Sequence, residues 1–191
     1  MSAHLAVHPF LLGSRPSLGD FALMGPLYAQ LYRDPYPGRL MRARAPRVAT
    51  WVERMNAPEA RSGAFLPHDA VPDTVVAMMR RIFAEQLPVL LDTARRVCDW
   101  IDAHPDTPLP RGIGFHTFTV GGVVERRAVV PYSLSMLQRV LDLRRSFDAT
   151  AGARVDRFLC AHGGAGVLSL ELRCRVRREH NVLTIDRSPR S

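Results

Sequence analysis

Apolar positions recur at helical spacing through most of the first 104 residues. Ser17 is followed by an apolar series that predicts a broad, largely buried helix, with Phe21, Leu23, Met24, Leu27, Tyr28 and Leu31 as its members. Pro46 opens a second predicted helix, which carries one apolar stripe made of Val48, Trp51, Val52 and Met55. A longer helical pattern runs from Pro72 to His104, and we expect Pro88 to kink or split it.

The pattern changes at Gly112. Two β-rich runs flank Gly121–Gly122, and a glycine pair in that position predicts a β-hairpin. Helical spacing returns over residues 132–149, a shorter helix is expected between Gly152 and Gly163, and residues 167–186 alternate as two strands would. We therefore predict a mainly α protein with a helical domain over residues 1–58. Residues 59–191 form a C-terminal α+β extension with a long helix, a hairpin, helices and terminal strands.

Ser17 and Asp20 have the spacing of a helix capping box. The Ser17 hydroxyl is placed to accept from the backbone N–H three residues later, and the Asp20 carboxylate to accept from the N–H of Ser17. Asp20 would also lie at the positive end of the helix dipole. We assign these two residues a structural role. The sequence predicts no catalytic residue and no metal ligand.

Composition places the chain among ordinary globular proteins, with 47% hydrophobic and 23% charged residues in 191. No apolar run approaches the roughly 20 residues that cross a bilayer, and the N-terminus does not read as a secretory signal. Cys98, Cys160 and Cys174 form no CxxC pair and no zinc pattern. We therefore expect a reduced, cytoplasmic setting and no contact with membranes.

A formal net charge of +8 raises the question of an anionic partner. All 26 basic residues are Arg, which favours a coding bias spread over the surface rather than a dedicated phosphate site. Only residues 173–180 are dense in charge, so polyanion or nucleic-acid binding is a minor alternative there. That alternative would use Arg173, Arg175, Arg177 and Arg178.

The first third of the chain resembles the C-terminal helical domain of the glutathione S-transferase superfamily. The resemblance covers about residues 4–58, with Gly19 in place of the usual Ala. It rests on a Leu-Gly turn, a Pro-Ser cap, the helix that follows, and a later helix opened by Pro and closed by Arg-Met. In this chain these are Leu12, Gly13, Pro16, Ser17, Asp20, Phe21, Pro46, Trp51, Arg54 and Met55.

The resemblance implies conjugation or thiol-transfer chemistry on an apolar electrophile, with glutathione as co-substrate. It assigns glutathione binding to a thioredoxin-like domain that we do not recognise in this sequence, so the chain reads as a truncated, substrate-side half with no cofactor of its own. We expect it to be inactive alone. A non-catalytic protein-interaction module of the same fold is the alternative, and a homodimer or another protein partner stays open. The substrate, its binding residues and the class within the family are not predicted.

Other chemically capable residues have simpler interpretations. Tyr28, Tyr32, Tyr36 and Tyr132 could donate to a thiolate, although core or loop positions are favoured. His116 in the predicted hairpin could transfer protons, and Arg111 could bind a carboxylate, but a strand histidine and a surface arginine are the preferred interpretations. Cys98 is expected to be a buried small hydrophobe. Cys160 with His162 as a reactive pair, and Gly163–Gly166 as a phosphate loop, are both disfavoured.

Overall fold

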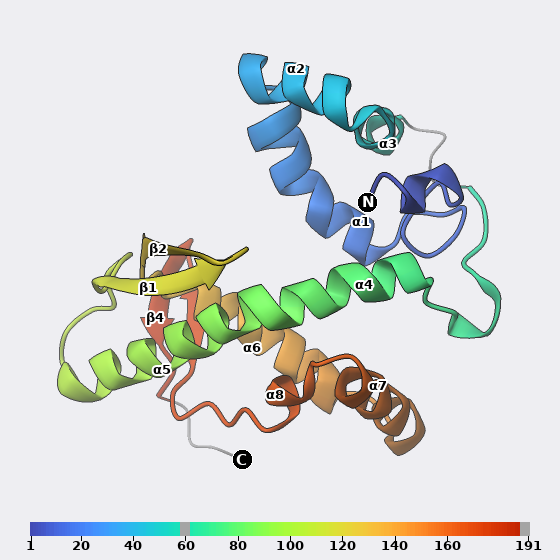
Figure 1. The fold of residues 1–191 in the computed structure, drawn as a ribbon. Helices are drawn as coiled ribbons and strands as arrows, with labels where there is room; N and C mark the ends of the chain where they lie inside the picture. The colour runs from blue at the N-terminus through green and yellow to red at the C-terminus, as the bar shows by residue number, and fades with distance from the viewer. Residues whose placement is uncertain (58–61, 188–191) are drawn as a thin grey trace. The chain divides into compact units, whose positions relative to one another are not determined.

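The computed structural model describes residues 1–57 and 62–187 and shows a mainly helical chain (Figure 1). It divides into two compact units, residues 1–79 and 80–191. In the first unit the elements are a short 3-10 turn η1 (His4–Ala6), α1 (Leu18–Met24), the π-helical η2 (Gly25–Tyr32), α2 (Pro35–Arg44), α3 (Pro46–Asn56), the turn η4 (Pro67–Asp69) and most of α4 (Asp73–Arg81).

The core of the first unit centres on α3. Its buried members are Phe10, Met41, Val48, Ala49, Trp51 and Val52. The stripe predicted for this helix is confirmed, because Trp51 and Val52 are fully buried and Val48 nearly so. Each apolar side chain of this stripe removes area from water, which contributes about 1.5–3 kcal/mol when burial is complete.

The helix that begins after Ser17 is less buried than the sequence predicts. Asp20 is the buried residue of α1, while Phe21 is 54% exposed and Leu31 in η2 is 40% exposed. The prediction of a largely buried helix is therefore wrong. Its partly buried positions pack on the α3 core from one side, and they are Leu23, Met24, Leu27 and Tyr28.

The connector after α3 returns to the N-terminal loop. Gly13 forms a β-bridge with Phe65, the Leu66 N–H donates to the Leu12 carbonyl at 2.9 Å, and the Ser14 N–H donates to the Ala64 carbonyl at 3.0 Å. These backbone bonds join residues 62–66 to the N-terminal loop, and both segments belong to the unit of residues 1–79.

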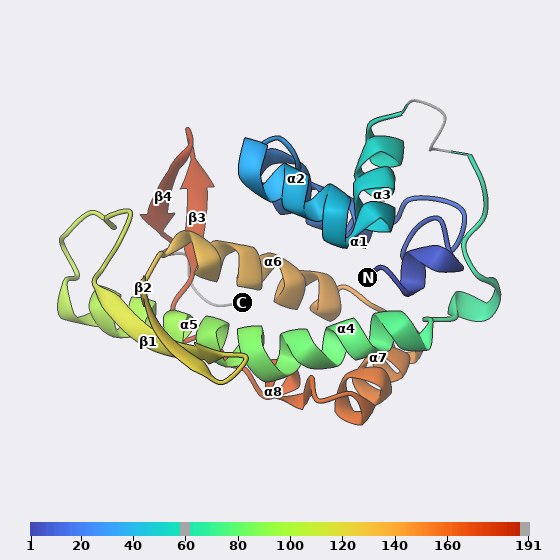
Figure 2. The ribbon, with the colours of Figure 1, turned by 45° about the horizontal axis from the view of Figure 1, so that its top comes forward.

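The second unit combines helices with two hairpins (Figures 1 and 2). Its elements are η5 (Ile82–Gln86), α5 (Leu87–Ala103), β1 (Phe115–Val120), β2 (Val123–Ala128), α6 (Tyr132–Arg145), α7 (Ala149–Ala161), α8 (Ala165–Leu168), β3 (Val176–Glu179) and β4 (Val182–Ile185). α6 packs along α5, and β3 contacts α6. The core between them is apolar and includes Ala94, Val97, Ile101, Val129, Leu134, Leu137, Leu141 and Val176.

Pro88 changes the helix locally, as its chemistry requires. The five residues of η5 adopt π geometry, and α5 then begins at Leu87 with Pro88 in its first turn. A proline lacks the N–H that would bond one turn back, and its ring displaces the carbonyl there, so a wider turn just before it relieves both problems. The predicted split at Pro88 is therefore a π-helical segment between α4 and α5.

Each predicted strand region contains a hairpin, but the second is shorter than residues 167–186, because residues 167 and 168 belong to α8 and β3 begins at Val176. β1 and β2 pair antiparallel with Val120 opposite Val123, which leaves Gly121 and Gly122 as a two-residue turn. Their φ angles of 58° and 81° suit a type I′ turn, which requires positive φ at both positions. β3 and β4 pair antiparallel from Val176 opposite Ile185 to Glu179 opposite Val182.

Cys98 on α5 is joined to Cys174 before β3 by a disulfide that spans 76 residues of sequence. Both cysteines are buried, so the expected burial of Cys98 is confirmed. The pairing itself is not visible in the spacing of the cysteines. It removes one reason for expecting a reduced compartment, because persistent disulfides are typical of oxidising ones.

Candidate functional site

Asp20 is the most densely hydrogen-bonded side chain of the first unit. Its carboxylate is fully buried and accepts from the Ser17 N–H at 2.9 Å, from the Ser17 hydroxyl at 2.7 Å and from the Leu11 N–H at 3.0 Å. The Asp20 N–H donates to the Ser17 hydroxyl oxygen at 3.4 Å, so both arms of the capping box are present. A buried carboxylate is stable in such a place only when donors surround it.

A second helix completes this network. The indole Nε1–H of Trp51 on α3 donates to Asp20 Oδ1 at 3.2 Å. The two stretches that carry the family resemblance, residues 12–21 and 46–55, therefore meet at one carboxylate. The spacing of Ser17 and Asp20 identified the cap, but nothing in the spacing indicated the bond to Trp51.

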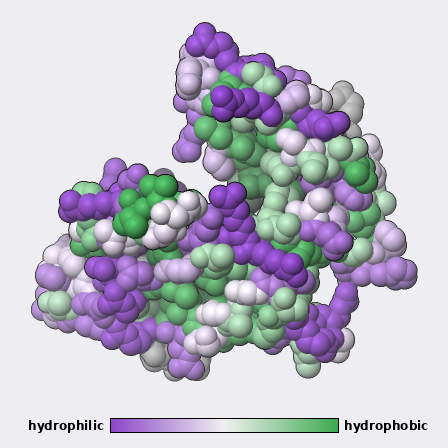
Figure 3. Space-filling model, in the orientation of Figure 1, coloured by the Kyte–Doolittle hydropathy of each residue, from purple (hydrophilic) through white to green (hydrophobic). Residues whose placement is uncertain are grey.

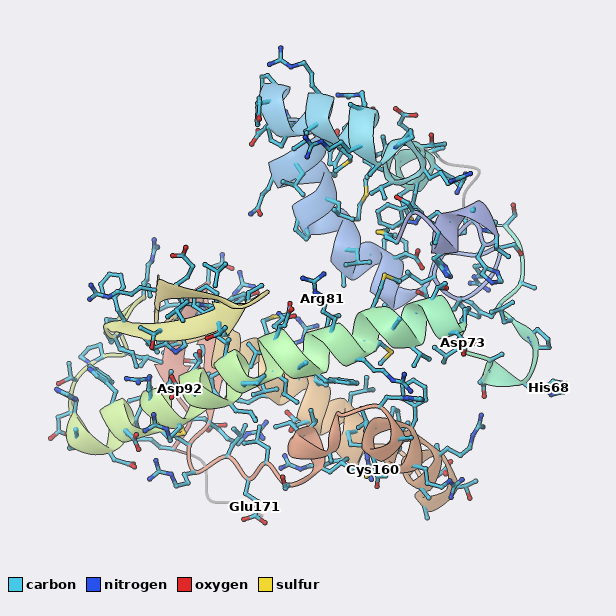
Figure 4. The ribbon with its side chains drawn as sticks, in the orientation of Figure 1. His68, Asp73, Arg81, Asp92, Cys160 and Glu171 are labelled. Atoms are coloured by element: carbon cyan, nitrogen blue, oxygen red, sulfur yellow. A yellow bond between two sulfur atoms is a disulfide. The ribbon has the colours of Figure 1, made fainter. Side chains whose placement is uncertain are left out.

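His116 and Asp92 form the main titratable pair of the second unit. His116 Nδ1 lies 2.7 Å from Asp92 Oδ2, and the histidine is 4% exposed. Asp92 lies on α5 beneath the β1–β2 hairpin (Figure 4) and also accepts from Arg96 Nε and Arg95 Nη2, each at 2.6 Å. The pair therefore ties β1 to α5. The sequence singled out His116 but not Asp92, whose signal is its position three and four residues before two arginines.

The environment of Asp92 favours its charged form. Burial by itself would raise the pKa of Asp92, but hydrogen bonds from His116, Arg96 and Arg95 outweigh it and hold that pKa well below its usual range. His116 Nε2 is buried and has no hydrogen-bond partner within residues 1–57 and 62–187.

Arg111 lines a cavity in the second unit. The sequence around it, with Pro110 and Gly112 on either side, gave no sign of this cavity. The cavity has a volume of about 360 Å³ and is also lined by Tyr132 at the start of α6 and by Arg178 on β3. Arg111 and Arg178 are thus brought together from positions 67 residues apart in the sequence. The volume of the cavity lies in the lower part of the range of small-molecule sites.

The arginines of residues 173–180 are largely neutralised within the chain. Arg173 pairs with Asp99 and with Asp102, Arg175 with Asp142, and Arg177 with Glu179. Arg175 holds the pKa of Asp142 below its ordinary value through their hydrogen bond. Carboxylates of the second unit therefore already engage three of the four arginines of this segment.

The remaining candidates each have separate local contacts. Tyr32 donates to Glu53 Oε1 at 2.6 Å and stacks with Tyr28, while Tyr36 is 70% exposed. Cys160 is a free, exposed thiol on α7 (Figure 4), and His162 instead contacts Arg80 and the ring of Phe158. Gly163 has a φ of 88° in the turn before α8, in agreement with a turn rather than a phosphate loop.

Hydrophobic residues are visible on the surface of the β1–β2 hairpin (Figure 3), whose exposed large hydrophobic residues are Phe115, Val120, Val123 and Val124. The described residues contain no group of three histidine, cysteine or acidic side chains that could hold a metal ion. Within the same residues, every helix is too short or too polar to cross a membrane.

Comparisons with models of protein families, with curated proteins and with solved structures found no match to this chain. The resemblance to the glutathione S-transferase superfamily therefore rests on the residues of this chain alone.

Proposed function

We propose that this chain supplies the substrate-side helical part of a glutathione-dependent transferase. The observation that supports the proposal is the meeting of Ser17, Asp20 and Trp51 at one buried carboxylate. The residues that resemble the family are thus neighbours in space as well as ordered in sequence, which is expected if they serve one fold.

The proposed chemistry is attack by the thiolate of glutathione on an electrophilic carbon, with a leaving group displaced. Residues of the first unit would contribute apolar contacts to the electrophile. Leu18 and Phe21 suit that role because they are 84% and 54% exposed, lie one helical turn apart, and sit directly after the cap. Glutathione is a co-substrate in this proposal and not a ligand of the described residues.

Equilibrium binding to the purified chain tests the proposed role of this apolar pair. We expect apolar electrophiles, such as nitro-substituted aryl chlorides, to bind saturably and to bind more weakly to a Leu18→Ser, Phe21→Ser double variant. Val7→Ser is the matched control, because Val7 is 75% exposed in the same unit but lies outside α1. Equal binding by the double variant and the control would remove the assignment.

A protein-interaction module is the second candidate, and the same exposure of Leu18 and Phe21 favours it, since bare apolar patches mark docking sites. It predicts that the purified chain self-associates or binds an apolar dye, and that the Leu18→Ser, Phe21→Ser variant does neither. A monodisperse monomer that binds no dye would count against this candidate.

Polyanion binding is the least favoured function, because acidic partners already engage Arg173, Arg175 and Arg177.

A further inference from the structure

The second unit contains a cavity whose walls come from three separate parts of the sequence. One wall is the loop between α5 and β1, the second is the segment between β2 and α6 with the first residue of α6, and the third is the β3–β4 hairpin. The cavity has a volume of about 360 Å³, within the lower part of the range of small-molecule sites. Its lining residues are Leu109, Pro110, Arg111, Val130, Tyr132, Arg178, Asn181, Val182 and Leu183.

Among the described residues, no carboxylate forms an ion pair with the two guanidinium groups that line this cavity. Arg111 makes no hydrogen bond or ion pair with any residue in the described ranges 1–57 and 62–187. Arg178 Nη2 donates to Asn181 Oδ1 at 2.6 Å, and an amide oxygen carries no net charge. The neighbouring Arg177 on the same strand is paired with Glu179, so the lack of an acidic partner is a feature of the cavity and not of the whole segment.

The rest of the lining is apolar, with one hydroxyl. Leu109, Pro110, Val130 and Leu183 offer hydrocarbon surface, and Tyr132 adds a ring with a phenolic group at the first residue of α6. Such a lining suits an apolar body, whose burial removes area from water. A guanidinium offers a planar set of donors that matches a carboxylate, so the two cations suit a ligand with an anionic head.

We propose that this cavity binds a small organic anion in which a carboxylate is attached to an apolar body of one or two rings. Arg111 and Arg178 hold the carboxylate, the Tyr132 hydroxyl donates to it, and the aliphatic residues contact the rings. The size of the cavity excludes a long polyanion from its interior. This proposal does not depend on the transferase function, because every residue it uses belongs to the second unit.

Isothermal titration of the purified 191-residue chain with 2-naphthoate tests the proposal. We expect saturable binding of 2-naphthoate and weaker binding of the neutral 2-naphthamide, which keeps the rings and lacks the charge. Arg111→Gln and Arg178→Gln should each weaken 2-naphthoate about tenfold, the typical loss when a charge-assisted hydrogen bond is removed. Tyr132→Phe should weaken it by a smaller factor, because the ring is retained.

Arg139→Gln is the matched control, since Arg139 is an exposed arginine of α6 that lies outside the cavity lining. It changes the net charge of the chain equally and should leave the affinity unchanged. Arg111→Gln removes no hydrogen bond or ion pair among the described residues, so this variant should fold normally even if Arg178→Gln does not. The proposal is overturned if 2-naphthoate does not bind, if 2-naphthamide binds as tightly, or if Arg111→Gln binds like Arg139→Gln.

Discussion

In each unit, one carboxylate forms hydrogen bonds to several segments of the chain. Asp20 accepts from the Leu11 loop, the Ser17 cap and the Trp51 indole, while Asp92 is bonded to His116 and two arginines. The sequence predicted the cap at Ser17 and Asp20, because a capping box is a local pattern. It could not predict the Trp51 or His116 bonds, because these join residues 31 and 24 positions apart, and such pairs leave no periodic signal.

Asp20→Asn should destabilise the first unit by about 2–3 kcal/mol. The amide keeps the shape of the carboxylate but turns one acceptor into a donor, facing donors from Leu11, Ser17 or Trp51. Hydrogen exchange read by mass spectrometry resolves the two units, so the loss of protection should be confined to residues 1–79. Asp34→Asn is the control, because Asp34 precedes α2 without a side-chain capping bond and should change stability by less than about 0.5 kcal/mol.

Asp92→Asn should destabilise the second unit by about 1–3 kcal/mol near neutral pH, because His116 loses a charged partner inside the protein. The folded pKa of Asp92 lies below its unfolded value of about 3.9. Its stabilisation is therefore present above that pH and is lost as the pH falls through the folded pKa.

Urea unfolding of the second unit at pH 6 and pH 3 measures this dependence. The Asp92→Asn variant should lose less stability between the two pH values than the unaltered chain does. The exposed Asp106 provides the control, since Asp106→Asn should reproduce the unaltered profile. A parallel pH dependence for Asp92→Asn and the unaltered chain would contradict the assigned role of Asp92.

Helices and hairpins were predicted well where their signals were local. The glycine pair at the β1–β2 turn, the Pro46 helix start and the effect of Pro88 follow from backbone geometry at those residues. The burial of the helix after Ser17 was wrongly predicted, because apolar spacing shows that a face exists and does not show how much of it finds a partner. The backbone bonds of residues 62–66 to residues 12–14 were not predicted, because they join segments about 50 positions apart in the sequence.

Gly122→Ala should destabilise the β1–β2 hairpin by about 1–2 kcal/mol, because a Cβ at a φ of 81° meets its own backbone. Open space around Gly122 means that the effect is conformational and involves no clash with other residues. Thermal unfolding followed by circular dichroism measures the change. Gly112→Ala in the same unit has ordinary φ and near-open surroundings, so it should be close to neutral; equal losses in both variants would refute the turn assignment.

At the scale of the whole molecule, the mainly α class with a hairpin-bearing C-terminal part is confirmed. The disulfide and the cavity were not predicted. Both depend on the contacts that residues 174–183 make with α5 and with the start of α6. The spacing of cysteines or arginines in the sequence carries no information about these contacts. The sequence marks Arg111 as a candidate for carboxylate binding and Arg178 as part of a basic segment. Nothing in it indicates that both residues line one cavity.

The disulfide closes a loop of 76 residues and should stabilise the second unit by about 2–5 kcal/mol. A Cys98→Ala, Cys174→Ala double variant should unfold at correspondingly lower urea, while Cys160→Ala should change little, because Cys160 is exposed. Alkylation of the unreduced chain followed by mass spectrometry should label Cys160 alone. Labelling of Cys98 and Cys174 in the folded, unreduced chain would show that the pair is not formed.

Glutathione conjugation, measured side by side on two samples, tests the central proposal most directly. One sample is the protein captured from its own cells with an antibody to this region, and the other is the purified 191-residue chain, both assayed over a panel of apolar electrophiles. We predict glutathione-dependent turnover by the captured protein and none by the 191-residue chain. Absence of turnover by the captured protein over the whole panel would contradict the transferase proposal, and turnover by the chain alone would contradict its assignment as the substrate-side part.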